Sequence, residues 1–175
     1  AGVKVAKHGN RSMTSRSGSA DVLEALGVDI TLSAEKVSEC IETIGLGFMF
    51  APSLHPAMKY VMGARKSLAI RTVFNILGPL CNPAGVKRQV IGVFDGKLTD
   101  RIAEVLQLLD AKHAMIVHGN DGLDEISTTD ATKYTELTPN GEIHSGMLTP
   151  SDFGLPVANP ESLLGGEPSE NAEII

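Results

Sequence analysis

Two patterns of apolar and polar residues open this chain of 175 residues. Val3 and Val5 alternate with lysines, as residues of a strand do. Four apolar residues then recur at helical spacing before Gly27, namely Ala20, Val22, Leu23 and Leu26. The polar stretch 7–19 is therefore predicted to be a loop that joins a strand to a helix.

A second helix is predicted between Ser33, which can cap its first turn, and Gly45, which can end it. Its apolar face comprises Val37, Cys40, Ile41 and Ile44. Residues 47–51 then indicate a short buried strand. Pro56 favours the first turn of a further helix. The stripe at spacings of three and four on that helix comprises Met58, Val61, Met62, Arg65 and Leu68.

The apolar run 72–77 predicts a buried strand, and the residues that follow it, 78–83, predict a rigid turn that contains two prolines. Gly78 in this turn would allow close approach of the backbone to a ligand. Strands are predicted again at 90–94 and 114–117. Between these strands a helix is predicted, which Thr99 can cap. Its inward face comprises Ile102, Val105, Leu106 and Leu109.

This alternation of strands and helices predicts an α/β fold, with a mainly parallel sheet and helices on its faces. Residues 133–137 and 142–147 flank a Pro-Asn-Gly turn and predict an added antiparallel hairpin. The tail beyond the hairpin is predicted to be irregular, with a last helix that Ser169 can cap. We expect one α/β domain over 1–175 that belongs to a longer chain, because the sequence opens without Met next to a strand and closes on Ile174 and Ile175.

Composition supports this fold and narrows the function. Hydrophobic residues make up 42% of the chain but aromatic residues only 4%, so the core is aliphatic, as in a helix-covered parallel sheet. The net charge of −6 disfavours nucleic acid or an anionic membrane as a partner. Cys40 and Cys81 lack metal-ligand spacing, no secretory segment is evident and no apolar run reaches membrane-spanning length. We therefore expect a cytoplasmic protein.

The polar loop is the first candidate site. It combines cations, hydroxyls and small residues: Lys7, His8, Gly9, Asn10, Arg11, Ser12, Met13, Thr14, Ser15 and Ser19. A strand-to-helix loop can offer backbone N–H groups and the positive end of the helix dipole to a phosphate, and its lysine and arginine add full charges. The alternative is a solvated loop, although Gly9 between His8 and Asn10 favours close approach of a ligand.

The second candidate is the segment after the strand at 114–117, which holds Asp121, Asp124 and Glu125. Mg²⁺ takes one or two protein carboxylates together with substrate phosphates, and Asp124 and Glu125 can supply that set. The alternative is a solvated acidic turn. The spacing does not fit a calcium loop.

Arg65 is the third candidate because it interrupts an apolar helical stripe. Its planar guanidinium suits a ligand carboxylate, although an arginine here can equally extend to the rim or form a structural ion pair. His55, just before the same helix, is either at the mouth of the site or structural. A phosphate loop, a magnesium turn and a carboxylate-binding arginine, without a nucleophile paired to a base, favour displacement at a carbon that bears a phosphorylated leaving group.

Four ordered motifs that span nearly the whole chain closely resemble the anthranilate phosphoribosyltransferase family. They are Lys7-His8-Gly9-Asn10-Arg11 with Ser17-Gly18-Ser19-Ala20-Asp21, Phe50-Ala51-Pro52 with His55-Pro56-Ala57-Met58, residues 71–80, and Gly122-Leu123-Asp124-Glu125. The resemblance implies transfer of phosphoribose from phosphoribosyl pyrophosphate (PRPP) to the amino group of anthranilate, in tryptophan biosynthesis, with Mg²⁺.

The resemblance also implies roles for residues. Lys7 through Ser15 and Ser19 would bind PRPP, Asn10, Arg65, His8 and Gly78 would bind anthranilate, and Asp124 and Glu125 would bind Mg²⁺. The family's helical domain, which usually forms a homodimer, its Gly-Thr-Gly-Gly-Asp loop with a nearby serine metal ligand, and its C-terminal helices are absent from these residues, so we expect the chain alone to be nearly inactive. Thr14 and Cys81 replace the commoner serine and threonine. Alternatives are a related pyrimidine nucleoside phosphorylase and a non-catalytic relative that binds nucleic acid.

Overall fold

The computed structural model describes the chain except for residues 1, 13–15, 59, 62, 64–66 and 68–72. It divides into two compact units. The first comprises Ala1–Asn75, Asn82–Ala84 and Leu164–Ile175, and the second comprises Ile76–Cys81 and Gly85–Leu163. No helix among the described residues has both the length and the apolar character needed to cross a membrane.

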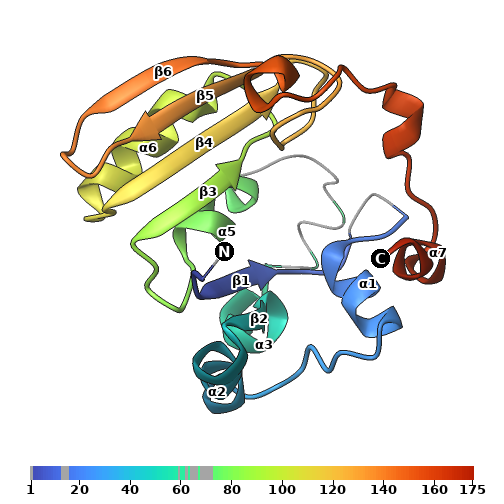
Figure 1. Ribbon diagram of the computed structural model, residues 1–175. Coiled ribbons are helices and arrows are strands. Elements are labelled where there is room, and N and C mark those ends of the chain that lie inside the picture. The colour runs from blue at the N-terminus through green and yellow to red at the C-terminus, as the bar shows by residue number, and fades with distance from the viewer. Residues whose placement is uncertain (1, 13–15, 59, 62, 64–66, 68–72) are drawn as a thin grey trace. The chain divides into compact units, whose positions relative to one another are not determined.

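The first unit is built on a pair of parallel strands, β1 (Val5–Gly9) and β2 (Leu46–Phe50), in register from Val5 opposite Leu46 to Gly9 opposite Phe50. Helix α2 (Ala34–Ile44) packs on β2. Helix α1 (Ser19–Ala25) packs against α7 (Pro168–Ile174), although the two are far apart in sequence (Figure 1). The predicted strand, loop and first helix are therefore confirmed.

The ends of α2 are those expected from the sequence. The Ser33 hydroxyl accepts the Lys36 N–H at 3.4 Å, and Gly45 ends the helix with a left-handed φ of 81°. Glycine adopts that conformation without the steric cost that a Cβ brings. The helix therefore begins and ends at the two predicted residues.

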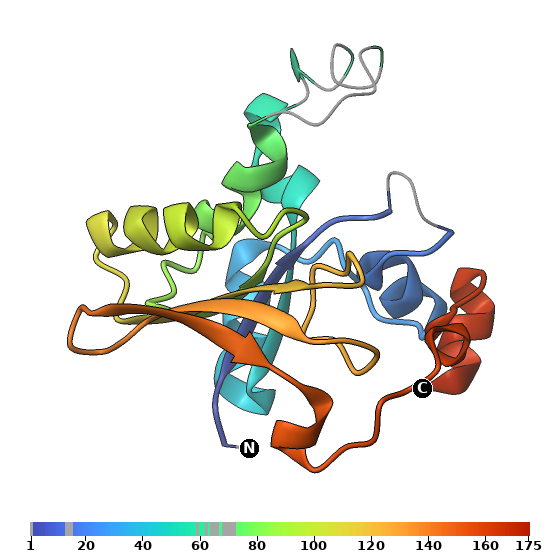
Figure 2. The same ribbon diagram turned by 90° about the horizontal axis from the view of Figure 1, so that it is seen from above.

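The second unit holds a four-stranded sheet in the order β3 (Arg88–Gly92), β4 (His113–Gly119), β5 (Thr132–Leu137) and β6 (Ile143–Leu148). The β3–β4 pair is parallel, and β5 and β6 join it as antiparallel strands. Helix α6 (Leu98–Leu108) lies along one face of this sheet (Figure 2). The predicted antiparallel hairpin is confirmed. Because it adds two antiparallel strand pairs to the parallel β3–β4 pair, this sheet is mixed.

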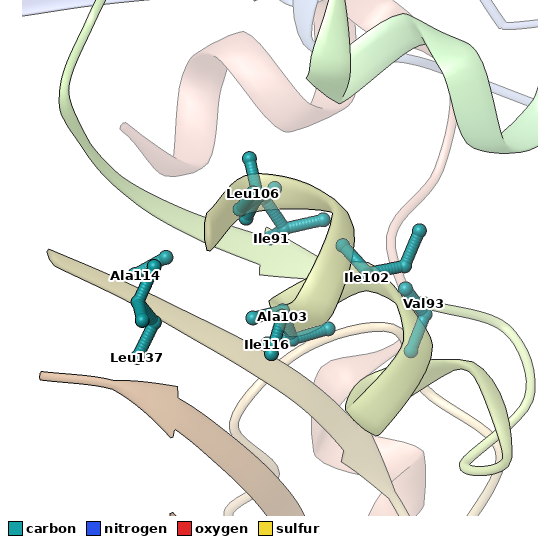
Figure 3. Close-up of a cluster of buried hydrophobic side chains, with 8 residues drawn as sticks. All are labelled: Ile91, Val93, Ile102, Ala103, Leu106, Ala114, Ile116 and Leu137. Carbon is teal, nitrogen blue, oxygen red and sulfur yellow. The ribbon is translucent and has the colours of Figure 1, made fainter. Parts of the chain in front are cut away.

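The core of the second unit lies between α6 and the sheet (Figure 3). Its buried members are Ile91, Val93, Ile102, Ala103, Leu106, Ala114, Ile116 and Leu137. All are aliphatic, as the composition predicts. Burial of this apolar surface is what holds the helix on the strands.

The prediction of a strand at 72–77 is wrong, because Phe74–Leu80 form helix α5. A short apolar run does not distinguish a strand from a buried helical segment by its periodicity. The Gly78-Pro79 pair does not break the segment into a turn, since Pro79 lies in the last turn of a seven-residue helix, where it removes only one hydrogen-bond donor.

The predicted details of α6 also need correction. The helix begins at Leu98, with Lys97 at its N-cap, and the buried Thr99 donates its hydroxyl to the carbonyl of Gly96 at 3.0 Å. Val105 and Leu109 are 37% and 52% exposed, whereas Ile102 and Leu106 are buried as predicted. Ala103 is buried in addition, so the buried face is centred on positions 99, 102, 103 and 106.

Several boundaries differ from the prediction, among them that of the strand expected at 90–94, which is Arg88–Gly92. Ala51 belongs to helix α3 (Ala51–Leu54), not to the preceding strand. A 3₁₀ turn covers Pro56–Met58, and Tyr60, Val61, Gly63 and Ser67 are helical, while Met62, Arg65 and Leu68 lie outside the described residues. In the tail, short 3₁₀ turns cover Pro150–Phe153 and Pro160–Leu163, and α7 begins at Pro168 after an N-cap at Glu167, not at Ser169.

Candidate functional site

The predicted phosphate loop follows the carboxyl end of β1 in the first unit. Lys7, His8 and Gly9 belong to the strand, and Ser19 opens α1. A Cβ at Gly9 would lie 2.9 Å from the Phe48 ring and 3.7 Å from the Ser19 hydroxyl, so glycine brings the strand end close to the start of the helix. Met13, Thr14 and Ser15 lie outside the described residues.

Asp21 holds the loop closed. Its carboxylate accepts the backbone N–H of Ser12 at 3.0 Å and that of Gly18 at 2.8 Å. The bond from Ser12 and then that from Gly18 lower the pKa of Asp21 against the opposing effect of desolvation. A Cβ at Gly18 would lie 2.7 Å from the Ser12 nitrogen, so only glycine fits at this closure.

This closure corrects the simplest form of the phosphate-loop hypothesis. Two of the backbone N–H groups in the loop donate to Asp21, so they are not the groups that face a phosphate. Sequence reasoning missed Asp21, although an acidic residue three positions after the N-cap Gly18 is a recognisable helix-start signal.

Arg11 is also engaged within the unit. Its Nε and Nη2 atoms donate to the Glu24 carboxylate at 2.9 and 2.6 Å, and its guanidinium carbon lies 4.7 Å from the centre of the Phe50 ring. The hydrogen bond to Glu24 raises the pKa of Arg11, and the same bond lowers the pKa of Glu24. The charge of Arg11 is therefore paired with Glu24 in this structure, and its contact with a phosphate remains a prediction.

His8 and His55 lie together. Their Nε2 atoms are 3.1 Å apart, and the rings meet edge to face with centroids 5.0 Å apart. One Nε2 donates and the other accepts, so at least one of the two nitrogens carries no proton. This contact joins the end of β1 to the segment after α3, and it is compatible with both alternatives for His55, a place at the mouth of the site or a structural role.

The residues predicted to bind anthranilate are only partly placed. His8 and Asn10 lie in the first unit, Gly78 lies within α5 in the second unit, and Arg65 lies outside the described residues. No described protein atom lies within 4 Å of a Cβ built at Gly78, so protein packing does not require glycine there. The grouping of these four residues remains a prediction.

The acidic residues lie in the loop 120–131, which joins β4 to β5 in the second unit and is called here the acidic loop. Asp121 accepts the Leu123 N–H at 3.1 Å and the hydroxyls of Ser127 and Thr129. Burial opposes ionisation of Asp121, but the bonds from Ser127 and Thr129 outweigh it and lower the pKa of Asp121.

Asp124 and Glu125 differ from Asp121. All three residues are exposed, but neither the Asp124 nor the Glu125 side chain has a hydrogen-bond or ion-pair partner within the described part of the chain. Such unpaired carboxylate oxygens fit Mg²⁺, which binds through one or two protein carboxylates plus substrate phosphates. Groups of three or more potential ligands from His, Cys, Asp and Glu do not occur among the described residues. These two carboxylates therefore suit a cation whose remaining ligands come from substrate and water.

Fold and loops together define an α/β domain with ligand-type polar loops after its parallel strands. The chain belongs to the glycosyl transferase family, a/b domain, which it matches over residues 1–175.

Several relatives of this chain are anthranilate phosphoribosyltransferases. The chain is 55% identical over 174 residues to an anthranilate phosphoribosyltransferase of Acetivibrio thermocellus, covering 99% of this chain and 50% of the relative. A solved anthranilate phosphoribosyltransferase of Thermus thermophilus superimposes with a TM-score of 0.87 at 47% identity, over 99% of this chain and 50% of that one. The anthranilate phosphoribosyltransferase of Saccharomyces cerevisiae, solved in complex with PRPP and Mg, superimposes with a TM-score of 0.86 at 34% identity. The match covers 98% of this chain and 47% of that one. The chain spans about half the length of these relatives.

Proposed function

We propose that this chain is the α/β part of an anthranilate phosphoribosyltransferase. The enzyme would transfer phosphoribose from PRPP to the amino group of anthranilate, giving N-(5-phosphoribosyl)anthranilate and pyrophosphate in tryptophan biosynthesis. The observation that carries the proposal is the likeness along the whole chain to enzymes of that description, among them one solved with PRPP and Mg. The strand-to-helix loop and the unpaired acidic pair support it.

The reaction forms one bond and breaks one. The amine nitrogen of anthranilate donates its lone pair to the anomeric carbon of the ribose, the bond from that carbon to the pyrophosphate oxygen breaks, and its electron pair leaves with pyrophosphate. The nitrogen then loses a proton to water. An aromatic amine is nucleophilic without a general base, so we assign no catalytic base in this chain. Positioning and charge stabilisation carry the rate.

The chain's residues would divide the work between the two substrates. PRPP would lie along the loop formed by Lys7 to Ser15 together with Ser19, where Lys7 supplies positive charge and Asp21 keeps the loop closed. Anthranilate would be oriented by Asn10, His8, Arg65 and the backbone at Gly78. The His8–His55 contact fixes the His8 ring for this role.

Asp124 and Glu125 would hold Mg²⁺. The ion, when bound, supplies positive charge to the departing pyrophosphate. Asp124 and Glu125 would hold the ion in place, and the backbone of the acidic loop that carries them is already ordered by hydrogen bonds. We further propose a homodimer formed by the helical domain that relatives carry, and a cytoplasmic location, without a role for nucleic acid or membrane.

The test uses the complete enzyme, meaning this chain together with the segments that its relatives carry beyond it. Purified protein is mixed with anthranilate, PRPP and Mg²⁺, and the loss of anthranilate fluorescence and the release of pyrophosphate are followed. We expect one pyrophosphate for each anthranilate consumed. Consumption of a pyrimidine nucleoside with phosphate, without use of PRPP, would overturn the proposal in favour of a phosphorylase.

A further inference from the structure

The acidic loop contains two kinds of carboxylate. Asp124 and Glu125 are exposed and unpaired in the described structure, whereas Asp121 accepts three hydrogen bonds from its own loop. A carboxylate has about four lone-pair positions, so Asp121 is nearly saturated by protein donors. It is therefore poorly suited to be a metal ligand itself, and its role must lie in the shape of the loop.

The donors to Asp121 are themselves fixed. Ser127 is 4% exposed, and its N–H donates to the hydroxyl of Thr132, a residue of β5 that is 1% exposed, at 2.9 Å. The Thr129 N–H donates to the Ser127 hydroxyl at 2.9 Å. Asp121 is thus tied through Ser127 and Thr129 to the buried start of β5.

The same carboxylate reaches the backbone next to the proposed metal ligands. Asp121 accepts the N–H of Leu123, and the carbonyl of Leu123 accepts the N–H of Gly119 at 2.8 Å, at the end of β4. The next residue is Asp124, whose carbonyl oxygen lies so close to Gly92 that a Cβ there would overlap it. The backbone around Asp124 is therefore held on one side by Asp121 and on the other by the end of β3.

We propose that Asp121 is a positioning residue for metal binding, which acts by setting the backbone from which Asp124 and Glu125 project. The inference rests on the proposed function, because it takes these two residues as the magnesium ligands. A loop ordered in advance spares the metal the cost of ordering it, and outer partners of metal ligands contribute to affinity in this way. Loss of Asp121 should therefore weaken metal binding without removing a ligand.

The test compares four forms of the complete enzyme: wild type, Asp121→Asn, Thr129→Val and Asp130→Asn. Thr129→Val keeps the side-chain shape and removes one hydroxyl donor to Asp121, so it reports on the network should Asp121→Asn fail to fold. Asp130→Asn is the matched control, since it makes the same charge change in the same loop at an exposed residue whose carboxylate accepts the N–H of Ala131 and not a donor to Asp121, and asparagine keeps that acceptor oxygen. Mn²⁺ binding in the presence of inorganic pyrophosphate is measured by electron paramagnetic resonance, without turnover.

We expect the Kd for Mn²⁺ to rise about 10-fold or more in Asp121→Asn and by a smaller factor in Thr129→Val, with Asp130→Asn like wild type. The Mg²⁺ concentration for half-maximal rate should rise in parallel, while kcat at saturating Mg²⁺ is largely retained. A purely structural role would instead lower kcat or the yield of folded protein and leave the Kd for Mn²⁺ unchanged.

An unchanged Kd in folded Asp121→Asn or Thr129→Val protein would overturn the inference, as would wild-type protein that binds no Mn²⁺. The inference and the proposed function fail separately. Normal turnover with unchanged Mn²⁺ binding in the variants contradicts the inference alone. A wild-type protein that does not consume PRPP, but whose Mn²⁺ binding weakens in Asp121→Asn, contradicts the function and retains the positioning role.

Discussion

The carboxylate of Asp21 accepts the backbone N–H of Ser12 at 3.0 Å, across nine positions of sequence. The same carboxylate accepts the backbone N–H of Gly18 at 2.8 Å. Asp21 therefore links two segments of the proposed PRPP loop, the one at Ser12 and the one at Gly18. Charge-assisted bonds of this kind are stronger than neutral ones. The loop is therefore shaped by the protein before any ligand binds.

Replacing Asp21 with Ala should open this loop. Because Asp21 also stands in the first turn of α1, we expect a loss of about 1–2 kcal/mol in the free energy of unfolding of this chain. Urea unfolding measures the loss, and hydrogen exchange should show reduced protection of the Ser12 and Gly18 amides. The control is Asp29→Ala, which removes two local bonds, from the N–H and the hydroxyl of Thr31, outside the loop. Unchanged exchange at Ser12 and Gly18 would contradict the closure.

The hydrogen bonds of Asp21 and Asp121, which the sequence did not predict, show where such reasoning stops. The residue types in these two segments were sufficient to predict a polar loop after each of two strands. In the structure one loop follows β1 and the other follows β4. Sequence does not say which carboxylate turns inward, because that depends on N–H and hydroxyl donors brought together by the fold, such as Ser12 for Asp21 and Thr129 for Asp121. The pairing of Arg11 with Glu24 was not predictable for the same reason, since Glu24 lies on α1.

Asp100 should make the stability of this chain depend on acid pH. Bonds from Ser145, Lys133 and Thr135, in that order of effect, lower the pKa of Asp100 to about 2 from its usual 3.8. A lowered pKa in the folded state stabilises the fold at pH values above the unfolded pKa. That contribution declines as the pH falls below about 4 and is lost once the pH passes through about 2.

The side chain of Asp100 is 49% exposed, so solvent screening limits this contribution to about 1 kcal/mol or less. Urea unfolding at pH 5 and pH 2 should show that Asp100→Asn loses less stability on acidification than wild type does. Asp95→Asn, an exposed residue before α6, serves as the control for loss of one carboxylate. Equal losses in wild type and Asp100→Asn would show that the network does not hold Asp100 ionised.

Gly47 and Gly78 should respond oppositely to alanine. A Cβ at Gly47 would lie within 3 Å of Val37 and Ile41, which pack from α2 onto β2, and overpacking of this kind costs about 1–3 kcal/mol. Gly78 has open space among the described residues and lies inside α5, where alanine is favoured over glycine by roughly 0.5–1 kcal/mol. Urea unfolding of Gly47→Ala and Gly78→Ala tests both, and equal stabilities would contradict the packing at Gly47.

The helices next to these two glycines, α2 and α5, differ in how far the sequence could predict them. Helix α2 and its neighbour β2 were predictable because Ser33 and Gly45 are local signals that act through the backbone of their own segment. Helix α5 was not, since an apolar run followed by Gly78-Pro79 is compatible with either a strand or a short helix until its packing is known. The antiparallel hairpin was predictable from its turn, but its addition to β4 depends on long-range pairing.

His55→Ala should weaken the use of anthranilate through His8. The variant removes one hydrogen-bond partner of the His8 ring, and a single hydrogen bond contributes about 0.5–1.5 kcal/mol, or roughly a 2- to 10-fold rise in KM for anthranilate. Steady-state kinetics of the complete enzyme measures it at saturating PRPP. A rise in KM for PRPP alone would instead assign His8 to the PRPP loop and not to anthranilate.

Asp124→Asn tests the metal assignment most directly. The variant keeps the size of the side chain and removes one negative charge from the proposed magnesium pair, so both metal affinity and stabilisation of the leaving group should fall. Loss of a preorganised charge-stabilising group commonly lowers the rate about 10²–10³-fold, or roughly 2.7–4 kcal/mol, and we expect at least that loss in the complete enzyme. Rates are compared over a series of Mg²⁺ concentrations, with Asp130→Asn as the control for charge in the same loop. Because the exposed Asp124 carboxylate has no hydrogen-bond or ion-pair partner among the described residues, its loss should leave the fold intact, and full activity at saturating Mg²⁺ would remove it from the metal site.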